Sequence, residues 1–272
     1  MLKKDGVAML ESHDIVVTAY GDSPHIDACI QSLQEQTVAP QSIVITTSTP
    51  SIFLHQVAAR HRLDLRINHG PAHIGGNWNF AFGSSDAGLL TLGHQDDLYL
   101  PDYCAQMMSL MTRHPDALIG FSDSVEHTDN GARDMSLNLR IKRYLTQRAF
   151  RGKEMISARA AKRRLLAWGN PVCCPSVVFR RTRLAGFKFD ESMRSNLDWD
   201  AWTNLADAPG EFVYASHPLV SKRVHVGSET SALLSDSTRL REDEYMFRRH
   251  WPSLIASLIA MGYRASYRAN RS

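Results

Sequence analysis

Short apolar runs alternate with amphipathic segments through the first 125 residues of the chain. Four of these runs have strand length and are rich in Val, Ile and Leu, at residues 14–20, 42–46, 63–67 and 88–92. Strands that alternate with helices along a chain assemble into a parallel sheet with helices on its faces. We therefore expect an α/β fold with a mostly parallel central sheet.

Three helices are expected between these strands. Asp22 or Ser23 is placed to cap the first helix, with Pro24 at its first position. Residues 50–61 and 75–85 have the other two helical patterns. Each helix would then cover a face of the sheet.

The second half of the chain is less regular. We expect a basic helical segment ending near Trp168, a strand at 176–180, a helix near 198–206, strands up to His225, and a terminal helix at 235–263 that is interrupted near Pro252. No internal repeat or low-complexity linker divides the chain.

The composition is that of an ordinary folded protein, with 43% hydrophobic and 22% charged residues and a net charge of +3. The charge is uneven, because residues 140–164 hold ten Lys or Arg against the single acid Glu154. A solvated helical face explains this run, and so does a patch for anionic lipid, diphosphate-linked acceptors or nucleic acid. No aromatic residue interleaves with the arginines of 151–164, which disfavours a base-stacking surface, so membrane proximity ranks above nucleic acid.

The cysteines and the apolar segments indicate a cytoplasmic protein. Cys29, Cys104, Cys173 and Cys174 have no metal-ligand spacing, and reduced thiols are expected. No run approaches the roughly 20 apolar residues that cross a bilayer, and the N-terminus is too weakly apolar for a signal peptide. Any membrane contact is therefore expected to be peripheral, at the inner face.

Ligands of open α/β sheets bind beyond the carboxyl ends of the strands, so the residues after each strand are the candidates for chemistry. After the strand at 88–92 come His94, Gln95, Asp96 and Asp97. Two adjacent carboxylates repel each other unless a cation lies between them and a substrate, and Mg²⁺ or Mn²⁺ prefers such hard oxygen ligands. The other interpretation, equally weighted on these residues alone, is that both acids cap the following helix, expected to start at Pro101.

The motifs also carry a family resemblance. The run IVVTAYGDSPHIDACIQSLQEQT from Ile15, followed by Pro40 and SIVIT, resembles the opening of family 2 glycosyltransferases. The stretch from Asn68 to Cys104, which contains HQDD, is similar to the donor-site segment of that family leading into its Asp-x-Asp motif. The match keeps its order over most of the chain. It implies a GT-A (Rossmann-like) fold, a nucleotide diphosphate sugar donor, a bound Mg²⁺ or Mn²⁺, and inversion at the anomeric carbon.

The resemblance assigns donor and metal residues. It implies donor contacts from Thr18, Tyr20, Thr47, Asn77, Gln95 and Asp96, with Asp96 as metal ligand and His94 and Asp97 in support. The chain departs from the family in three places: Thr46, Thr47 and Ser48 replace acids near the nucleobase, His94 replaces the first motif acid, and Tyr20-Gly21 stands where Tyr-Asn is common. A neutral imidazole at His94 still offers a ligand or hydrogen-bonding atom.

A second constellation surrounds Asp198 in the segment NLDWDAW. From the residues alone, Asp198 and Asp200 favour a helix start while the tryptophans pack. The resemblance instead makes Asp198 the catalytic base, which takes the proton of the acceptor hydroxyl. In the first turn of a helix, the helix dipole would keep Asp198 ionised. Trp199 and Tyr99 are candidates for stacking on a sugar, and equally for the core.

A third constellation is RVHVGSETS from Arg223, similar to the family's Arg-x-His-x-Gly-Ser-x-x-Ser stretch. By itself a histidine there is more often a packed or surface residue. With Asp96 upstream, the resemblance makes His225 a second metal ligand, and Ser228 a supporting donor to the diphosphate. It divides the chain into a catalytic domain of residues 1–232, with a donor half at 12–125 and an acceptor half at 126–232, and a helical extension at 233–272.

The resemblance implies transfer of a sugar to a glycan or lipid-linked glycan, as in surface polysaccharide biosynthesis. Trp251, Leu254, Ile255, Leu258 and Ile259 give the terminal helix an apolar stripe that suits either an anionic membrane surface or its own domain. One alternative is a non-catalytic nucleotide- or sugar-binding module that has kept the fold. A nucleotidyltransferase is disfavoured because VVTAYGDSP has neither the glycines nor the lysine of a phosphate loop.

Overall fold

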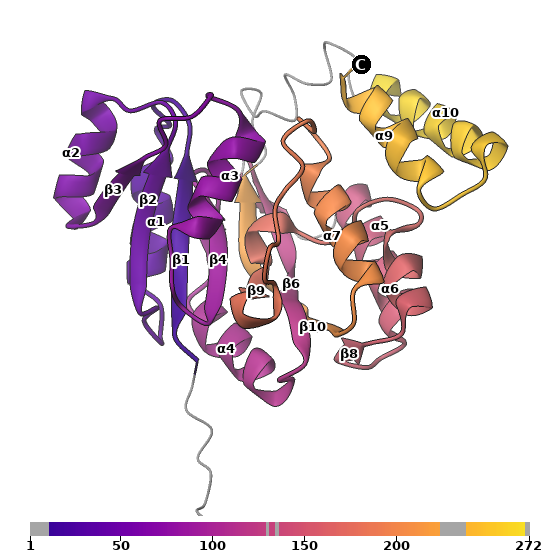
Figure 1. The fold of residues 1–272 in the computed structure, drawn as a ribbon, viewed down its shortest axis with the longest axis horizontal. Helices are drawn as coiled ribbons and strands as arrows, with labels where there is room; N and C mark the ends of the chain where they lie inside the picture. The colour runs from indigo at the N-terminus through magenta and orange to yellow at the C-terminus, as the bar shows by residue number, and fades with distance from the viewer. Residues whose placement is uncertain (1–10, 129–130, 134–135, 224–237, 270–272) are drawn as a thin grey trace, which may run out of the picture.

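The computed structural model describes residues 11–128, 131–133, 136–223 and 238–269. Its strands form one sheet in the order β3-β2-β1-β4-β9-β6-β10-β5, with β7 beside β6 and β8 beside β10 (Figure 1). The strands are β1 (His13–Ala19), β2 (Ser42–Thr47), β3 (Asp64–Ile67), β4 (Leu89–His94), β5 (Leu98–Tyr99), β6 (Ala117–Thr128), β7 (Gly131–Arg133), β8 (Met155–Ile156), β9 (Val178–Arg180) and β10 (Glu211–Arg223).

The helices lie on both faces of this sheet and at one end of it. They are α1 (Ile26–Gln34), α2 (Ile52–His61), α3 (Ile74–Gly83), α4 (Tyr103–Arg113), α5 (Leu137–Phe150), α6 (Arg159–Leu166), α7 (Leu197–Asp207), α9 (Thr238–Arg248) and α10 (Ser253–Ala269). In Figure 1, α2 and α10 lie at opposite ends of the molecule.

The first half has the strands and helices that its hydrophobic pattern predicts. Strands β3, β2, β1 and β4 are parallel neighbours, and all seven residues of β1 are buried, as expected of a strand covered on both faces. The predicted start of α1 is wrong. Pro24 lies in a turn, the helix begins at Ile26 after His25, and neither Asp22 nor Ser23 caps it. The Ser23 hydroxyl instead bonds Asp96.

The second half completes the sheet with strands of both directions. β6 and β10 are parallel, with register shifts between Ala215 and Val220, while β9 runs antiparallel between β4 and β6. The expected series of late strands is one long strand, β10, which ends at Arg223. The helix expected at Pro101 begins at Tyr103, because the short strand β5 and a turn come first.

The basic segment is two helices, not the single helix that we expected. α5 ends at Phe150; Arg151, which follows it, has a φ of 53°, and Gly152 has a φ of 76°. Both values lie in the left-handed region, which stops a right-handed helix. β8 then pairs with β10 before α6 begins. Arg148 of α5 and Arg163 and Arg164 of α6 nevertheless line one hollow.

The C-terminal segment folds into two helices that pack on each other and on the main core. Met246, Phe247, Ala256 and Ala260 are buried in the same cluster as α7, and the ring of Phe247 lies 5.2 Å from that of Trp199. The predicted interruption near Pro252 is confirmed. No helix in the described part of the chain is long and apolar enough to cross a membrane.

Candidate active site

The turn that follows β4 holds the predicted metal carboxylate at the carboxyl edge of the sheet. The backbone N–H of Asp97 donates to the carbonyl of His94 (3.2 Å), which closes the turn. Asp96 is half-buried, and its Oδ1 accepts a hydrogen bond from the hydroxyl of Ser23. Asp97 is buried, and its Oδ1 accepts from the backbone N–H of Arg223 (2.8 Å). The two adjacent aspartates thus face different partners.

Burial sets the protonation of the residues beside Asp96. It raises the pKa of Asp97 to about 6, although Lys222 and the Arg223 N–H oppose the rise. Burial, followed by the charge of Lys222, lowers the pKa of His94 to about 4. His94 is therefore a neutral imidazole at pH 7. Its Nε2 is buried and has no hydrogen-bond partner in the described structure.

A pair of hydrogen bonds ties the turn after β4 to the loop after β1. The Gln95 amide accepts from the backbone N–H of Tyr20 (3.2 Å) and donates to its carbonyl (2.9 Å). Gly21 follows with a φ of 62°, a conformation that glycine adopts without strain, and its N–H donates to the hydroxyl of Thr49 (2.8 Å). Tyr20 itself is 61% exposed, so its ring faces solvent beside Gln95.

The remaining predicted donor residues lie at the same edge, and all their side-chain polar atoms except the Asn77 oxygen have protein partners. Thr18 is buried, and its hydroxyl donates to the carbonyl of Gly93 (3.1 Å). The Thr47 hydroxyl accepts from the N–H of Thr49 (3.0 Å). Asn77 donates to the carbonyl of Ala19 (3.4 Å), while its Oδ1 is buried without a partner in the described structure. Of these groups, the Asn77 oxygen keeps an acceptor position for a ligand.

The residues present fit a metal that is shared with a substrate. Among the described residues, no group of three or more His, Cys, Asp and Glu is arranged to hold an ion by itself. Mg²⁺ commonly uses one or two carboxylates together with substrate phosphates, and the half-buried Asp96 beside the unpartnered Nε2 of His94 matches that need. His225 and Ser228, the other predicted residues, lie outside the described residues.

Asp198 is the second residue of α7, where the sequence motif predicts the helix start. Its Oδ1 accepts from the N–H of Trp199 (2.7 Å), and its Oδ2 accepts from the side-chain amide of Asn170 (2.7 Å). The carboxylate is half-buried. These two bonds hold it in one orientation at the edge of the site.

The pKa of Asp198 is raised, opposite to the direction expected from the helix dipole. Burial is the largest cause, and the N–H of Trp199 and the charges of Lys142, Arg239 and Lys222 lower the pKa only in part. The sequence motif does not reveal this burial. A raised pKa brings the carboxylate closer to the working pH and makes it a stronger base.

Lys222 links the two motifs. Its charge lowers the pKa of Asp97 and of His94 on one side and of Asp198 on the other. The side chain comes from β10, whose last residue, Arg223, donates to Asp97. Residues that lie about a hundred positions apart in sequence are thus within electrostatic reach of one ammonium.

Sequence reasoning missed several residues of this site. Ser23 was expected to cap a helix, whereas Lys142, Lys222 and Asn170 carried no assigned role. Their signal is tertiary, because each comes from a different element and only folding brings it to a carboxylate. The sequence shows the basic run of 140–164, but it does not show that Lys142 is the cation of this run that acts on Asp198.

The two aromatic stacking candidates belong to the core. Trp199 is 2% exposed and donates from Nε1 to the carbonyl of Leu166 (3.1 Å). Tyr99 is 3% exposed, and its hydroxyl donates to the carbonyl of Pro175 (2.9 Å). Neither ring is open to a sugar in this structure.

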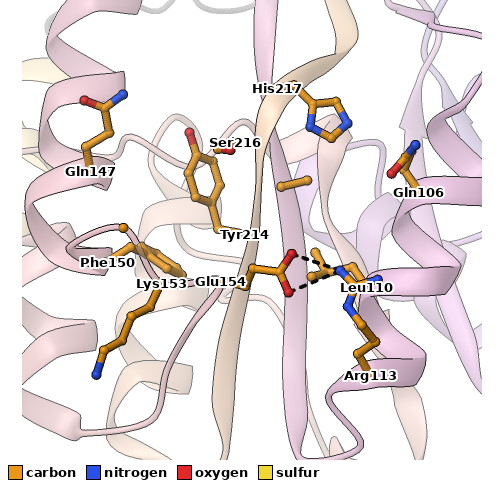
Figure 2. Close-up of a pocket in the computed structure, with 12 residues that line it drawn as sticks. Gln106, Leu110, Arg113, Gln147, Phe150, Lys153, Glu154, Tyr214, Ser216 and His217 are labelled. Atoms are coloured by element: carbon orange, nitrogen blue, oxygen red, sulfur yellow. Dashed lines mark hydrogen bonds and ion pairs between the residues drawn. The ribbon is translucent and has the colours of Figure 1, made fainter.

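A separate hollow of about 190 Å³ lies between α4, α5 and β10, and Figure 2 shows the residues that line it. Arg113 and Glu154 form an ion pair across it (3.0 Å), and Tyr214 and His217 lie along its β10 side. None of the predicted site residues lines this hollow. The candidate active site is therefore the edge of the sheet around Asp96, Lys222 and Asp198.

The family model for glycosyl transferase family 2 matches residues 14–185, more than half of the chain. The chain belongs to this family. A search of curated proteins finds no match. The family match covers the turn after β4 but ends before Asp198, so the assignment of Asp198 rests on the motif and on its surroundings.

Solved structures share the fold. S. aureus TarS residues 1–349, in complex with UDP-GlcNAc, has a TM-score of 0.64 and 13% identity, covering 92% of this chain and 70% of that one. The mannosyltransferase PcManGT from Pyrobaculum calidifontis, in complex with GDP-Man and Mn²⁺, has a TM-score of 0.62 and 14% identity, covering 96% and 76%. The chain spans 42% of the longer TarS structure. The expected GT-A fold is confirmed.

Proposed function

We propose that this glycosyltransferase moves a sugar from a nucleotide diphosphate donor to a hydroxyl of a glycan or lipid-linked glycan, with inversion at the anomeric carbon. One observation carries the proposal: the end of β10 reaches both regions, because Arg223 donates to Asp97 and to the Asp96 carbonyl while the neighbouring Lys222 lowers the pKa of Asp198. This supports a single site that contains both the donor-side carboxylates and the base. The structures bound to UDP-GlcNAc and to GDP-Man and Mn²⁺ support a nucleotide-sugar donor.

On the donor side, Asp96 would hold a Mg²⁺ or Mn²⁺ ion through a carboxylate oxygen, and His94 and His225 are the candidates for nitrogen ligands. The ion would supply Lewis-acid stabilisation of the departing diphosphate. The chain's own residues would position the donor and offset the negative charge of its diphosphate. Ser23 orients Asp96, Gln95 fixes the Tyr20 loop, and Lys222 adds a positive charge beside the leaving group.

On the acceptor side, Asp198 would take the proton of the acceptor hydroxyl as its oxygen attacks the anomeric carbon. The bonds from Trp199 and Asn170 keep the carboxylate in place, while partial burial raises its pKa. Attack from the face opposite the leaving diphosphate gives inversion. We keep the division into a catalytic domain of residues 1–232 and an extension of 233–272 as part of the proposal.

A thermal-shift screen tests the proposal. Nucleotide diphosphates and their sugars are added with and without Mn²⁺ to wild type and to Asp96→Ala. A ligand at a hundredfold excess over its dissociation constant adds about 2.7 kcal/mol of stability, which is readily detected. Stabilisation by one nucleotide class only with metal, and lost in Asp96→Ala, supports the transferase. Ligand binding without any turnover across many donors would favour the non-catalytic module.

A further inference from the structure

A second cationic hollow, remote from the turn after β4, lies between α5, α6 and the segment that joins α9 to α10. Its volume is about 400 Å³, and four arginines and two tryptophans dominate its lining: Arg148, Arg163, Arg164, Trp168, Arg249 and Trp251. The lining brings together two parts of the chain about 80 residues apart, as the spacing of Trp168 and Trp251 shows. We call it the arginine hollow.

The arginine hollow has more positive charge than its carboxylate neighbours neutralise. Arg249 pairs with Asp200, and the Arg163 Nε lies 3.2 Å from Asp207. Arg148 and Arg164 have no hydrogen bond or ion pair with any described residue, and both are exposed. The Nη1 of Arg163 is buried without a partner in the described structure. Two exposed guanidinium groups, those of Arg148 and Arg164, therefore remain available to an anion.

Two tryptophans form a firm aromatic wall in the arginine hollow. The rings of Trp168 and Trp251 are 4.7 Å apart, and the Trp251 Nε1 donates to the carbonyl of Ala167 (2.6 Å). Tyr263 donates to the carbonyl of Trp168 (2.8 Å), which ties α10 to the same wall. Trp168 remains 43% exposed. Indole rings that are held at a surface beside cations are typical of the boundary between lipid headgroups and acyl chains.

An exposed apolar stripe begins three residues after Trp251. Leu254, Leu258 and Met261 recur at helical spacing on α10 and are 83%, 68% and 63% exposed. The stripe differs from the one expected from sequence, because Trp251 and Ile259 pack against the core instead. Figure 1 shows α10 at the outer edge of the molecule. An exposed apolar helix face beside cations suits the plane of an anionic membrane.

We propose that the arginine hollow binds the phosphate group of an anionic membrane lipid while the exposed stripe of α10 enters the headgroup and acyl boundary. Guanidinium groups recognise phosphate through paired N–H donors, and the apolar stripe contributes contacts that a free phosphate or a nucleic acid would leave unused. This surface would attach the enzyme to a membrane and would take no part in the sugar transfer itself.

Co-sedimentation of the full chain with vesicles tests the proposal. Wild type is expected to pellet with vesicles of phosphatidylcholine and phosphatidylglycerol, and to remain in solution with phosphatidylcholine alone. Arg148→Glu with Arg164→Glu is expected to weaken this binding at least tenfold, since each arginine near an anionic surface contributes about fivefold. Leu254→Ser with Leu258→Ser is expected to weaken it as well.

The matched control is Arg62→Glu with Lys188→Glu. It makes the same change in net charge at two exposed cations outside the arginine hollow. Wild-type vesicle binding in this variant supports a local site, whereas an equal loss would show a net-charge effect and overturn the proposal. Circular dichroism and thermal unfolding confirm that each variant is folded, and its donor-induced thermal shift reports the active site separately.

Three further results would overturn the proposal. If wild type stays in solution with anionic vesicles, the hollow does not bind an anionic lipid. Competition by inorganic phosphate, together with full vesicle binding by the leucine variant, makes the hollow a site for free phosphate. If wild type is a dimer and the leucine variant is a monomer, the α10 stripe binds a second copy of the chain instead of a membrane.

Discussion

The turn after β4 and the first turn of α7 both carry two aspartates. In each region one aspartate is buried and bound within the fold: Asp97 accepts the N–H of Arg223, and Asp200 pairs with Arg249. The other aspartate, Asp96 or Asp198, is half-buried at the edge of the site. A motif with two acids therefore divides into one structural carboxylate and one that faces the substrate side.

The surroundings of the two half-buried carboxylates, Asp96 and Asp198, differ. Asp198 lies within reach of the charges of Lys142, Arg239 and Lys222. Asp96 has a hydroxyl partner in Ser23 and a second carboxylate next to it in the chain. The comparison teaches that the charge of Lys222 acts on both regions, and that the predicted metal ion would add to it only at the turn after β4.

Replacing the α7 aspartates should separate the two roles most strongly. Asp198→Asn removes the base and is expected to lower kcat about 10³-fold, because a positioned general base contributes roughly 10² to 10⁴. Donor affinity should stay within a factor of about two. Steady-state transfer and a donor titration on the same preparation measure both quantities.

Asp200→Asn is the matched control. It breaks a buried ion pair with Arg249 and is expected to cost about 3 kcal/mol of unfolding free energy, while the folded enzyme keeps most of its kcat. Denaturant unfolding gives the first value. An Asp200→Asn enzyme as inactive as Asp198→Asn, yet fully stable, would reverse the roles assigned to the pair.

The cations around Asp198 should set its working pH. Lys142 lowers the pKa of Asp198, so Lys142→Met is expected to raise that pKa further and shift the acid limb of the kcat profile to higher pH. Activity should recover at alkaline pH. Arg140→Met, an exposed residue on the same helix, is the control, and an identical profile in wild type and Lys142→Met would contradict the assigned influence.

The smallest effect is expected at the donor-side loop. Gln95→Ala removes both bonds to Tyr20, so the KM for the donor should rise about fivefold, the effect of roughly one net hydrogen bond, with kcat unchanged. Gln147→Ala, at the hollow of Figure 2, is the control for loss of an exposed amide. A change in kcat instead of KM would mean that the loop acts during the chemical step.

The hydrophobic pattern predicted the parallel half of the sheet because short apolar runs alternate there with helical segments. It did not predict the β6, β9 and β10 arrangement, in which β9 inserts antiparallel between β4 and β6. Strand order depends on contacts between segments that lie far apart in sequence. The same reason explains why one helix was expected where α5 and α6 stand, since pairing of β8 with β10 is a tertiary event.

For the site, the motifs predicted where the carboxylates lie along the chain, but not their environments. The position of Asp198 at a helix start was visible, whereas its burial and the approach of Lys142 were not. Similarly, HQDD contains two adjacent acids, and only the fold shows that the backbone N–H of Arg223 donates a hydrogen bond to Asp97. The metal and donor assignments of the turn after β4 remain predictions.

The most direct test is a calorimetric titration of the donor found in the thermal-shift screen. It is carried out on wild type, Asp96→Ala and Asp198→Asn, each with Mn²⁺ and with a chelator. The account predicts that wild type and Asp198→Asn bind the donor alike and only with metal, and that Asp96→Ala binds weakly in both conditions. Metal-dependent binding that survives in Asp96→Ala, or disappears in Asp198→Asn, would contradict the division between the two carboxylates.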